Sequence, residues 1–284
     1  MTLHQSALQL THPSTPRKPS GYRFPASQYS VYTRLDRKDT AMASDALPSS
    51  SATDDRLVFF FDIDNCLYSR NLQIHDKMQV LIDDYFERHL SLSREDAAIL
   101  HARYYQDYGL ALDGLIRHHR IDALEYNREV DDALPLEDII KPDPALRTLL
   151  ESVDRSRVKL WLFTNAYVTH GKRVVKLLGI ADLFEGITYC DYAAEEGLVC
   201  KPKVQAFEKA MREAAATDRA KCYFVDDSGK NCQGATDFGW TTAHYVEEGM
   251  HAAKKWKDAA RYHIHRLEEL QNVFPDLFKK DGSS

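Results

Sequence analysis

The unbroken apolar run Phe59, Phe60 and Phe61, followed at once by Asp62 and Asp64, constrains the fold more than any other stretch of this chain. An apolar segment of this kind is typical of a strand covered on both faces, as in a parallel sheet with helices on either side. The two acids come where that strand ends, at the edge where open α/β sheets bind their ligands. The sequence therefore predicts an α/β domain with two carboxylates at its ligand-binding edge.

A second acidic pair follows another apolar segment far downstream. Cys-Tyr-Phe-Val at 222–225 runs into Asp226 and Asp227, much as the first segment runs into Asp62 and Asp64. Each pair taken alone is also explained by an Asp that caps a turn or a helix. Both pairs at one edge would concentrate negative charge, which requires a cation. We expect a hard divalent metal bound by oxygen ligands, with Mg²⁺ as the preferred ion.

Two further polar signals stand at the ends of predicted segments. Thr164 and Asn165 follow the apolar segment 159–163, and Lys201 follows the turn-rich segment 196–200. By itself, Thr164 would be interpreted as a helix cap and Lys201 as a solvated surface charge. An acid pair, a Thr, a Lys and a second acid pair in this order together favour one shared site.

This order resembles the signature of the haloacid dehalogenase superfamily of phosphatases: Asp-x-Asp, then Thr or Ser, then Lys, then paired acids. The resemblance covers roughly residues 57–245. Cys66 stands where Thr or Val is usual, and as a small residue it fits the same buried turn. A closer likeness, to the fungal pyrimidine 5′-nucleotidases, rests on Phe-Asp-Ile-Asp-Asn-Cys-Leu-Tyr (61–68), Leu-Phe-Thr-Asn-Ala-Tyr (162–167), Val-Lys-Leu-Leu-Gly-Ile-Ala-Asp-Leu-Phe (175–184), Thr-Tyr-Cys-Asp-Tyr (188–192) and Asp-Asp-Ser-Gly-Lys-Asn (226–231).

The resemblance implies roles in phosphate-ester hydrolysis. Asp62 would be the nucleophile that forms an aspartyl-phosphate, and Asp64 would be the general acid and base. Because residues i and i+2 of an extended chain face the same side, both carboxylates are expected to reach one phosphorus. Thr164, the backbone N–H of Asn165 and Lys201 would bind the phosphate.

The resemblance also implies that Mg²⁺ is held by Asp62, the backbone carbonyl of Asp64 and Asp227, with Asp226 and Asn231 in support. We expect a magnesium-dependent hydrolase that removes the 5′-phosphate of nucleoside monophosphates, with UMP and CMP favoured. The alternatives are a phosphatase for a sugar phosphate or lysophosphatidic acid, and a non-catalytic binding protein on the same fold. A dehalogenase is disfavoured, because a halide leaves without a proton and needs neither Asp64 nor a metal.

The chain is expected to have three parts. Residues 1–55 hold five of the ten prolines and fifteen Ser and Thr, and are expected to be disordered. Residues 56–68 and 142–284 alternate strands and helices, which predicts a doubly wound, Rossmann-like parallel sheet. Residues 69–141 show helical apolar spacing and are expected to form an inserted helical cap. Expected strands are 158–163, 187–189, 222–225 and 241–245, with an edge strand near 262–264; expected helices are 75–90, 93–108, 113–119, 123–134, 170–178, 203–215 and 231–238.

Aromatic residues offer weaker signals. Tyr68, beside the first acid pair, and Tyr108, in the predicted cap, are our candidates for substrate contact. Tyr104 and Tyr105 are interpreted as core residues. The histidines at 118–119 face different ways on a helix, which favours a surface or packing role over a shared ligand site.

Composition narrows the class of protein. A net charge of −6 gives no reason to expect binding to nucleic acid or a membrane surface, so the expected partner is a small molecule. The five cysteines contain no Cys-x-x-Cys pair, which favours small core residues and a reducing compartment, cytoplasmic and also nuclear, over disulfides or a zinc site. Six Lys and Arg against two acids before Met42 weakly resemble a mitochondrial transit peptide, although prolines would break its helix. Met42 is an alternative start, and the sequence leaves the oligomeric state open.

Overall fold

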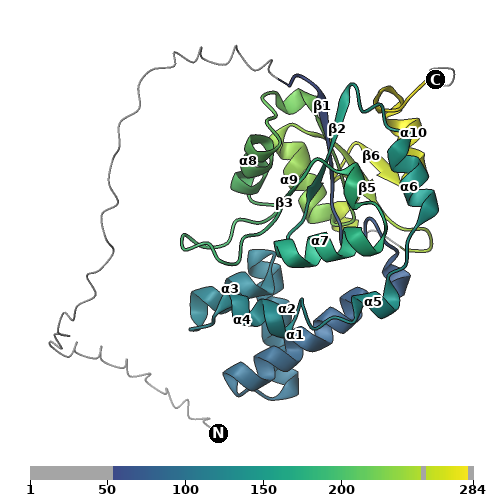
Figure 1. Ribbon diagram of the computed structural model, residues 1–284. Helices are drawn as coiled ribbons and strands as arrows, with labels where there is room; N and C mark the ends of the chain where they lie inside the picture. Colours follow the sequence, from purple (N-terminus) through teal and green to yellow (C-terminus); the bar gives the residue numbers. More distant parts are fainter. Residues whose placement is uncertain (1–53, 251–253, 281–284) are drawn as a thin grey trace, which may run out of the picture. The chain divides into compact units, whose positions relative to one another are not determined.

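The computed structural model describes residues 54–250 and 254–280 (Figure 1). The disorder expected for residues 1–55 therefore lies, except for Asp54 and Asp55, outside the described residues. The strands are β1 (Leu57–Phe61), β2 (Val158–Phe163), β3 (Gly186–Thr188), β4 (Cys222–Asp226), β5 (Thr241–Tyr245) and β6 (Tyr262–Ile264). They form a six-stranded parallel sheet in the order β3-β2-β1-β4-β5-β6. This order confirms the doubly wound fold and puts the topological switch point between β1 and β4, where such sheets bind ligands.

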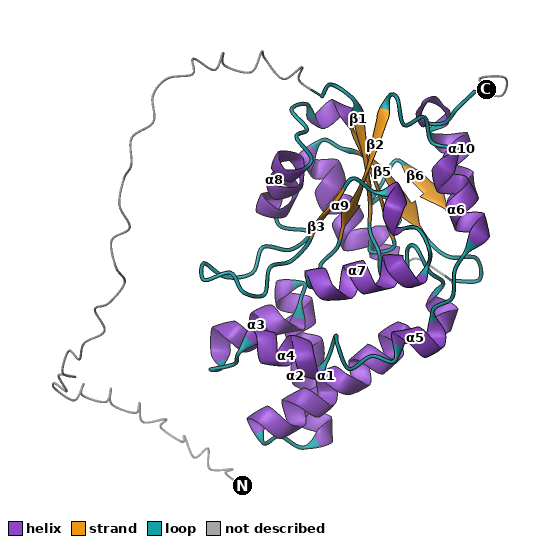
Figure 2. Ribbon diagram, in the orientation of Figure 1, coloured by secondary structure: helices purple, strands orange, loops and turns teal. Residues whose placement is uncertain are grey.

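Strand β1 is buried on both faces, as its apolar run predicts. Phe59 and Phe61 pack into one apolar cluster and Val58 and Phe60 into another, and none of the four is more than 2% exposed. Each such side chain contributes about 1.5–3 kcal/mol through burial. The first cluster lies against α6 (Pro144–Glu151), α7 (Val168–Leu177) and α10 (Leu270–Val273), and the second against α8 (Val204–Glu213) and α9 (Gly229–Phe238). Figure 2 shows the two sets of helices on opposite sides of the sheet.

The segment between β1 and β2 is helical. It contains α1 (Ile74–Leu90), α2 (Arg94–Tyr108), α3 (Ala111–His118), α4 (Ala123–Glu129) and α5 (Leu136–Ile139), which we call the cap. In Figure 1 the cap helices lie beneath the sheet, on the side toward which β1 runs. None of the helices in the described ranges is long and apolar enough to cross a membrane. Short 3-10 turns are η1 (Arg70–Leu72), η2 (Ala181–Leu183), η3 (Arg219–Lys221), η4 (Lys254–Trp256), η5 (Leu267–Glu269) and η6 (Pro275–Leu277).

One helix prediction was wrong, and helices α5 and α6 were not predicted. The helix expected at 123–134 ends at Glu129, because Asp132 bonds back to Asn127 through both backbone and side chain and so favours a turn. Helix α6 was not predicted from the sequence. Pro144 occupies the first turn, where its missing N–H costs nothing, and Asp143 caps the helix.

The apolar interior of the cap is not formed by cap residues alone. Tyr85, Phe86 and Tyr126 pack in one cluster with residues of the segment 189–200, which follows β3 in the sheet domain. Those residues are Cys190, Tyr192, Leu198 and Cys200, and all four are buried. We call this assembly the cap cluster. It joins the cap to the segment that leads directly into Lys201.

Candidate active site

The two acidic pairs meet at the carboxyl ends of β1 and β4. These strands are parallel neighbours with Phe61 opposite Val225, and the N–H of Asp62 donates to the Val225 carbonyl at 3.0 Å. Carboxylate oxygens of Asp62, Asp226 and Asp227 lie within 4.8 Å of one another. We call these three residues the carboxylate cluster. The switch point of the sheet thus brings together acids that are far apart in the sequence.

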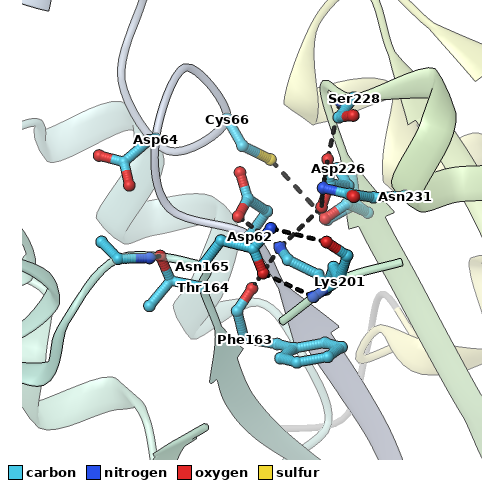
Figure 3. A network of polar contacts seen from close by, with 12 residues as sticks. Asp62, Asp64, Cys66, Phe163, Thr164, Asn165, Lys201, Asp226, Ser228 and Asn231 are labelled. Carbon is cyan, nitrogen blue, oxygen red and sulfur yellow. Dashed lines mark hydrogen bonds and ion pairs between the residues drawn. The ribbon is translucent and has the colours of Figure 1, made fainter. Parts of the chain in front are cut away.

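Lys201 lies among these carboxylates and is completely buried (Figure 3). Its Nζ donates to Asp62 Oδ1 at 2.6 Å, to Asp226 Oδ2 at 2.7 Å and to the Phe163 carbonyl at 2.6 Å. An ammonium has three N–H donors, so all of them are used. Burial acts to lower the pKa of Lys201, but the charges of Asp226 and Asp62 outweigh it and raise the pKa above its usual range. Lys201 is therefore a fixed positive charge.

Asp226 and Asp227 differ in what they bind. Asp226 Oδ1 accepts from the Ser228 N–H at 2.7 Å, and both of its oxygens accept from Asn231 Nδ2, at 3.2 and 3.1 Å. Together with Lys201 these donors occupy Asp226 fully. Within the described residues, the hydrogen bond to Asp227 goes to its backbone carbonyl, so its carboxylate is free to bind something else. Burial and the charge of Asp226 raise the pKa of Asp227 to about 7.

These residues fit a magnesium ion. Three carboxylates and one ammonium leave an excess of two negative charges when all are ionised. Burial, followed by the charge of Asp226, also raises the pKa of Asp62, which shows that Lys201 balances the acids only in part. A divalent cation with a preference for oxygen ligands matches both the charge and the donor set. Asp62 and Asp227 offer oxygens for the ion. Asp226 bonds Lys201 and Asn231, and so fixes the residues around the ion.

Asp64 turns away from the carboxylate cluster (Figure 3). Its Oδ1 accepts from the Tyr68 hydroxyl at 2.8 Å and lies 2.7 Å from His170 Nε2. Because β1 ends at Phe61 and Asp64 lies in a turn, the two-residue period of an extended chain does not continue to it. Burial acts to raise the pKa of Asp64, but the charge and hydrogen bond of His170 outweigh it and lower the pKa. Burial acts to lower the pKa of His170, but the charge and hydrogen bond of Asp64 outweigh it and raise the pKa of His170 to about 9.

Thr164 and Asn165 lie at the end of β2. Thr164 is buried, and its Oγ1 accepts from the Ala166 N–H at 3.0 Å, which leaves the hydroxyl hydrogen free to donate. The Asn165 side chain holds the backbone of Lys201 at two points. Its Oδ1 accepts from the Lys201 N–H at 2.7 Å, and its Nδ2 donates to the Lys201 carbonyl at 2.9 Å. Asn165 therefore fixes the lysine, a role that the sequence analysis did not assign to its side chain.

The two tyrosine candidates have different surroundings. Tyr68 contacts Asp64 and so belongs to the polar network of the site. The hydroxyl of Tyr108 lies 2.6 Å from His118 Nε2, and the guanidinium of Arg117 lies 5.3 Å from the centre of its ring. The structure does not bring Tyr108 to the carboxylate cluster. The packing role expected for the histidines at 118–119 is confirmed, since His119 bonds Tyr104 in the same way.

His170 is a site residue that the sequence analysis missed. It is buried in the first turn of α7, which starts at the edge where β2 ends. The available signal was its position just after Thr164 and Asn165, at the helix that follows a strand of the site. A lone histidine in an apolar helix is, however, usually a packing residue, and its contact with Asp64 spans 106 positions of the sequence.

A sequence model described as haloacid dehalogenase-like hydrolase matches residues 57–239. The chain is 43% identical over 201 residues to Phosphate metabolism protein 8 of Saccharomyces cerevisiae, covering 68% of this chain but only 63% of the yeast protein. It is 23% identical over 225 residues to Pyrimidine 5′-nucleotidase YjjG of Escherichia coli, covering 74% of this chain and 96% of that protein. A solved hydrolase structure from Pseudomonas syringae shares the fold with a TM-score of 0.58 at 19% identity, covering 79% of this chain and 100% of that one. With its acids, lysine and threonine at the edge of this sheet, the chain belongs to the haloacid dehalogenase-like hydrolase family.

Proposed function

We propose that the protein is a magnesium-dependent phosphomonoester hydrolase that removes the 5′-phosphate of nucleoside monophosphates, with UMP and CMP preferred. The observation that carries the proposal is the buried Lys201–Asp62 pair beside Asp226 and Asp227. A buried, charge-paired carboxylate at an open sheet edge is an arrangement suited to nucleophilic attack on an anionic ester.

Asp62 is the proposed nucleophile. Its Oδ1 is held by Lys201, so Oδ2 is the oxygen that attacks. A bond forms between Oδ2 and phosphorus while the ester P–O bond to the leaving group breaks, which gives an aspartyl-phosphate. Lys201 stays bonded to Oδ1 and balances negative charge, and the Thr164 hydroxyl and the backbone N–H of Asn165 donate to phosphoryl oxygens.

Asp64 is the proposed general acid and base. Together with His170 it holds one proton across a 2.7 Å hydrogen bond, and this proton passes to the leaving oxygen as the ester bond breaks. The Asp64 carboxylate and neutral His170 that remain then take a proton from water, whose oxygen attacks the phosphorus of the aspartyl-phosphate and breaks its bond to Asp62. Inorganic phosphate leaves and the carboxylate of Asp62 is restored.

The proposed metal ligands are Asp62, the backbone carbonyl of Asp64 and Asp227, with Asp226 and Asn231 in support. When bound, Mg²⁺ would supply the positive charge that keeps Asp62 ionised and that neutralises the phosphate dianion. The raised pKa of Asp62 supports this, because a nucleophilic carboxylate must lose its proton.

The substrate class is supported by the relatives. The E. coli relative is named a pyrimidine 5′-nucleotidase, and the segments around the acids and Thr164 resemble the fungal enzymes of that activity. A sugar phosphate or lysophosphatidic acid is the alternative substrate, and a non-catalytic binding protein is the alternative class.

A substrate panel tests the proposal. Phosphate release by the purified protein should have its highest kcat/KM for UMP and CMP among purine nucleotides, sugar phosphates and lysophosphatidic acid. EDTA should abolish release and Mg²⁺ should restore it. Asp62→Asn should remove turnover while circular dichroism and Tm stay native, because an amide forms no acyl phosphate. Activity that survives chelation would exclude the metal role, and turnover by Asp62→Asn would exclude this nucleophile.

A further inference from the structure

The last turn of cap helix α2 lies against the catalytic edge of the sheet. A Cβ at Gly109, which ends the helix, would lie 3.6 Å from the Lys201 carbonyl oxygen and 3.6 Å from Pro202. Lys230, in the first turn of α9, donates from Nζ to the carbonyl of Gln106 at 3.4 Å. Lys201 lies among the acids of the carboxylate cluster, and α9 begins at Gly229, just after Asp227 of that cluster. The end of α2 is therefore placed over the site.

Tyr105 lies on the face of α2 that docks there. It precedes Gly109 by four residues, and residues at this spacing share one face of a helix. Although this face meets the sheet domain, the side chain of Tyr105 is 54% exposed. Burial, followed by the charges of Asp227 and Asp226, raises the pKa of its phenol. Its place on the docking face of α2 puts Tyr105 beside the catalytic edge, while the residue stays open to solvent.

The neighbouring tyrosines of α2 are occupied by other contacts, whereas Tyr105 is not. Tyr104 is buried and bonded to His119, and Tyr108 is bonded to His118. In the part of the chain that the structure describes, Tyr105 has neither a hydrogen bond for its hydroxyl nor an aromatic neighbour. The expectation that Tyr105 is a core residue was wrong. Its ring is a free aromatic surface beside the proposed phosphate site.

Arg70 supplies a cation beside Asp227 at the proposed phosphate site. It begins η1, just after the acid pair of β1, and lines a cavity of about 190 Å³ together with Asp227. Among the described residues, no ion pair involves its guanidinium, and only its backbone N–H is bonded, to Glu247 at 2.9 Å.

We propose that Tyr105 and Arg70 form the subsite for the leaving group, with a nucleobase stacked on the Tyr105 ring and a ring carbonyl accepting from Arg70. The inference rests on the proposed hydrolysis of nucleoside monophosphates. An exposed aromatic ring suits any flat base, since every base has a π-face. A guanidinium donates and never accepts, so the C2 carbonyl oxygen of uracil or cytosine is a suitable acceptor for Arg70. Adenine has no carbonyl and could accept only through its ring nitrogens.

The test compares UMP with ribose 5-phosphate, which keeps the ester and the sugar and lacks the base. Tyr105→Ala should lower kcat/KM for UMP about tenfold or more, the range of base–aromatic stacking, and leave ribose 5-phosphate unchanged. Tyr105→Phe should retain most of the activity. Tyr108→Ala, one turn further along the same helix, is the matched comparator and should leave the ratio of the two substrates unaltered. Arg70→Gln should lower kcat/KM for UMP more than for AMP.

The outcomes separate this inference from the proposed function. A wild-type protein that hydrolyses neither compound overturns the proposed function. An active wild-type protein whose preference for UMP over ribose 5-phosphate survives Tyr105→Ala overturns the Tyr105 subsite alone. Equal losses on UMP and AMP in Arg70→Gln overturn the carbonyl contact. Uridine as a competitive inhibitor gives a second readout, and its inhibition constant should rise in Tyr105→Ala at unchanged Tm.

Discussion

Replacing Lys201 by Met tests whether the carboxylate cluster depends on one buried cation. The substitution keeps much of the side-chain volume and removes a charge that lies 2.6 Å from Asp62 and 2.7 Å from Asp226. At an effective dielectric constant of about 20, each such pair is worth about 6 kcal/mol before desolvation is subtracted. Because breaking a buried pair leaves an uncompensated charge, we expect the free energy of unfolding to fall by about 3–5 kcal/mol.

The assay is urea unfolding followed by circular dichroism at pH 7.5 in EDTA, with Lys159→Met as the matched control. Lys159 is also buried in the sheet, and its Nζ donates to the Ala214 carbonyl at 2.7 Å and pairs with the partly exposed Asp54 at 2.8 Å. Because solvent screens the charge of Asp54, the free energy of unfolding of Lys159→Met should fall by only about 1 kcal/mol.

The pH dependence separates the two variants. In Lys201→Met the buried Asp62 loses its cation, so it binds a proton more readily in the folded state than in the unfolded state. Stability of this variant should therefore recover as the pH falls from 7.5 to 5, and adding Asp226→Asn should recover part of it at pH 7.5. Equal losses in the two lysine variants, or a Lys201→Met deficit that does not change with pH, would refute the reasoning.

Three further outcomes are expected. Burial raises the pKa of Asp131 from 3.8 to about 6, so the folded state holds this proton more tightly than the unfolded state. Asp131 should therefore lower wild-type stability by about 3 kcal/mol as the pH rises from about 4 to about 6, and urea titrations of Asp131→Asn should lack this contribution. His170→Gln should lower kcat about tenfold or more with a native Tm and little change in KM, since it leaves Asp64 without its proton partner; an unchanged kcat would contradict the assigned role. Gly114→Ala places a Cβ 2.2 Å from Tyr104 Cγ, and calorimetry should show a loss of about 1–3 kcal/mol from overpacking of the cap.

The sheet was predictable because its residues are buried on both faces. The strands expected at 158–163 and 241–245 have the bounds observed for β2 and β5. The apolar run of β1 that ends in two acids marks that central strand directly. Helix ends were less predictable. Helix α7 begins at Val168, two residues earlier than expected, because Tyr167 precedes it and makes no side-chain cap that a sequence pattern would show.

The surroundings of single side chains were the least predictable. The order of acids, threonine and lysine predicted that these residues share one sheet edge, and Lys201 does contact Asp62. The orientation of Asp64 depends on His170, which a distant segment supplies. In the sequence Tyr105 looks like a core residue, because helical spacing places it near apolar neighbours. That spacing does not show which side chains of α2 the sheet domain leaves exposed.

The cap cluster has a consequence for engineering. Its interior includes Tyr192 and Cys200 from the sheet domain, and the segment that carries them ends at Lys201. Cutting the chain at the ends of the cap helices would therefore strip apolar partners from the segment that holds the catalytic lysine in place. Local stability is shared along such contiguous packing units. A graft that exchanges the cap for that of another family member has to carry segment 189–200 with it. A minimal enzyme made by deleting the cap would expose the apolar residues of this segment and leave the Lys201 backbone to Asn165.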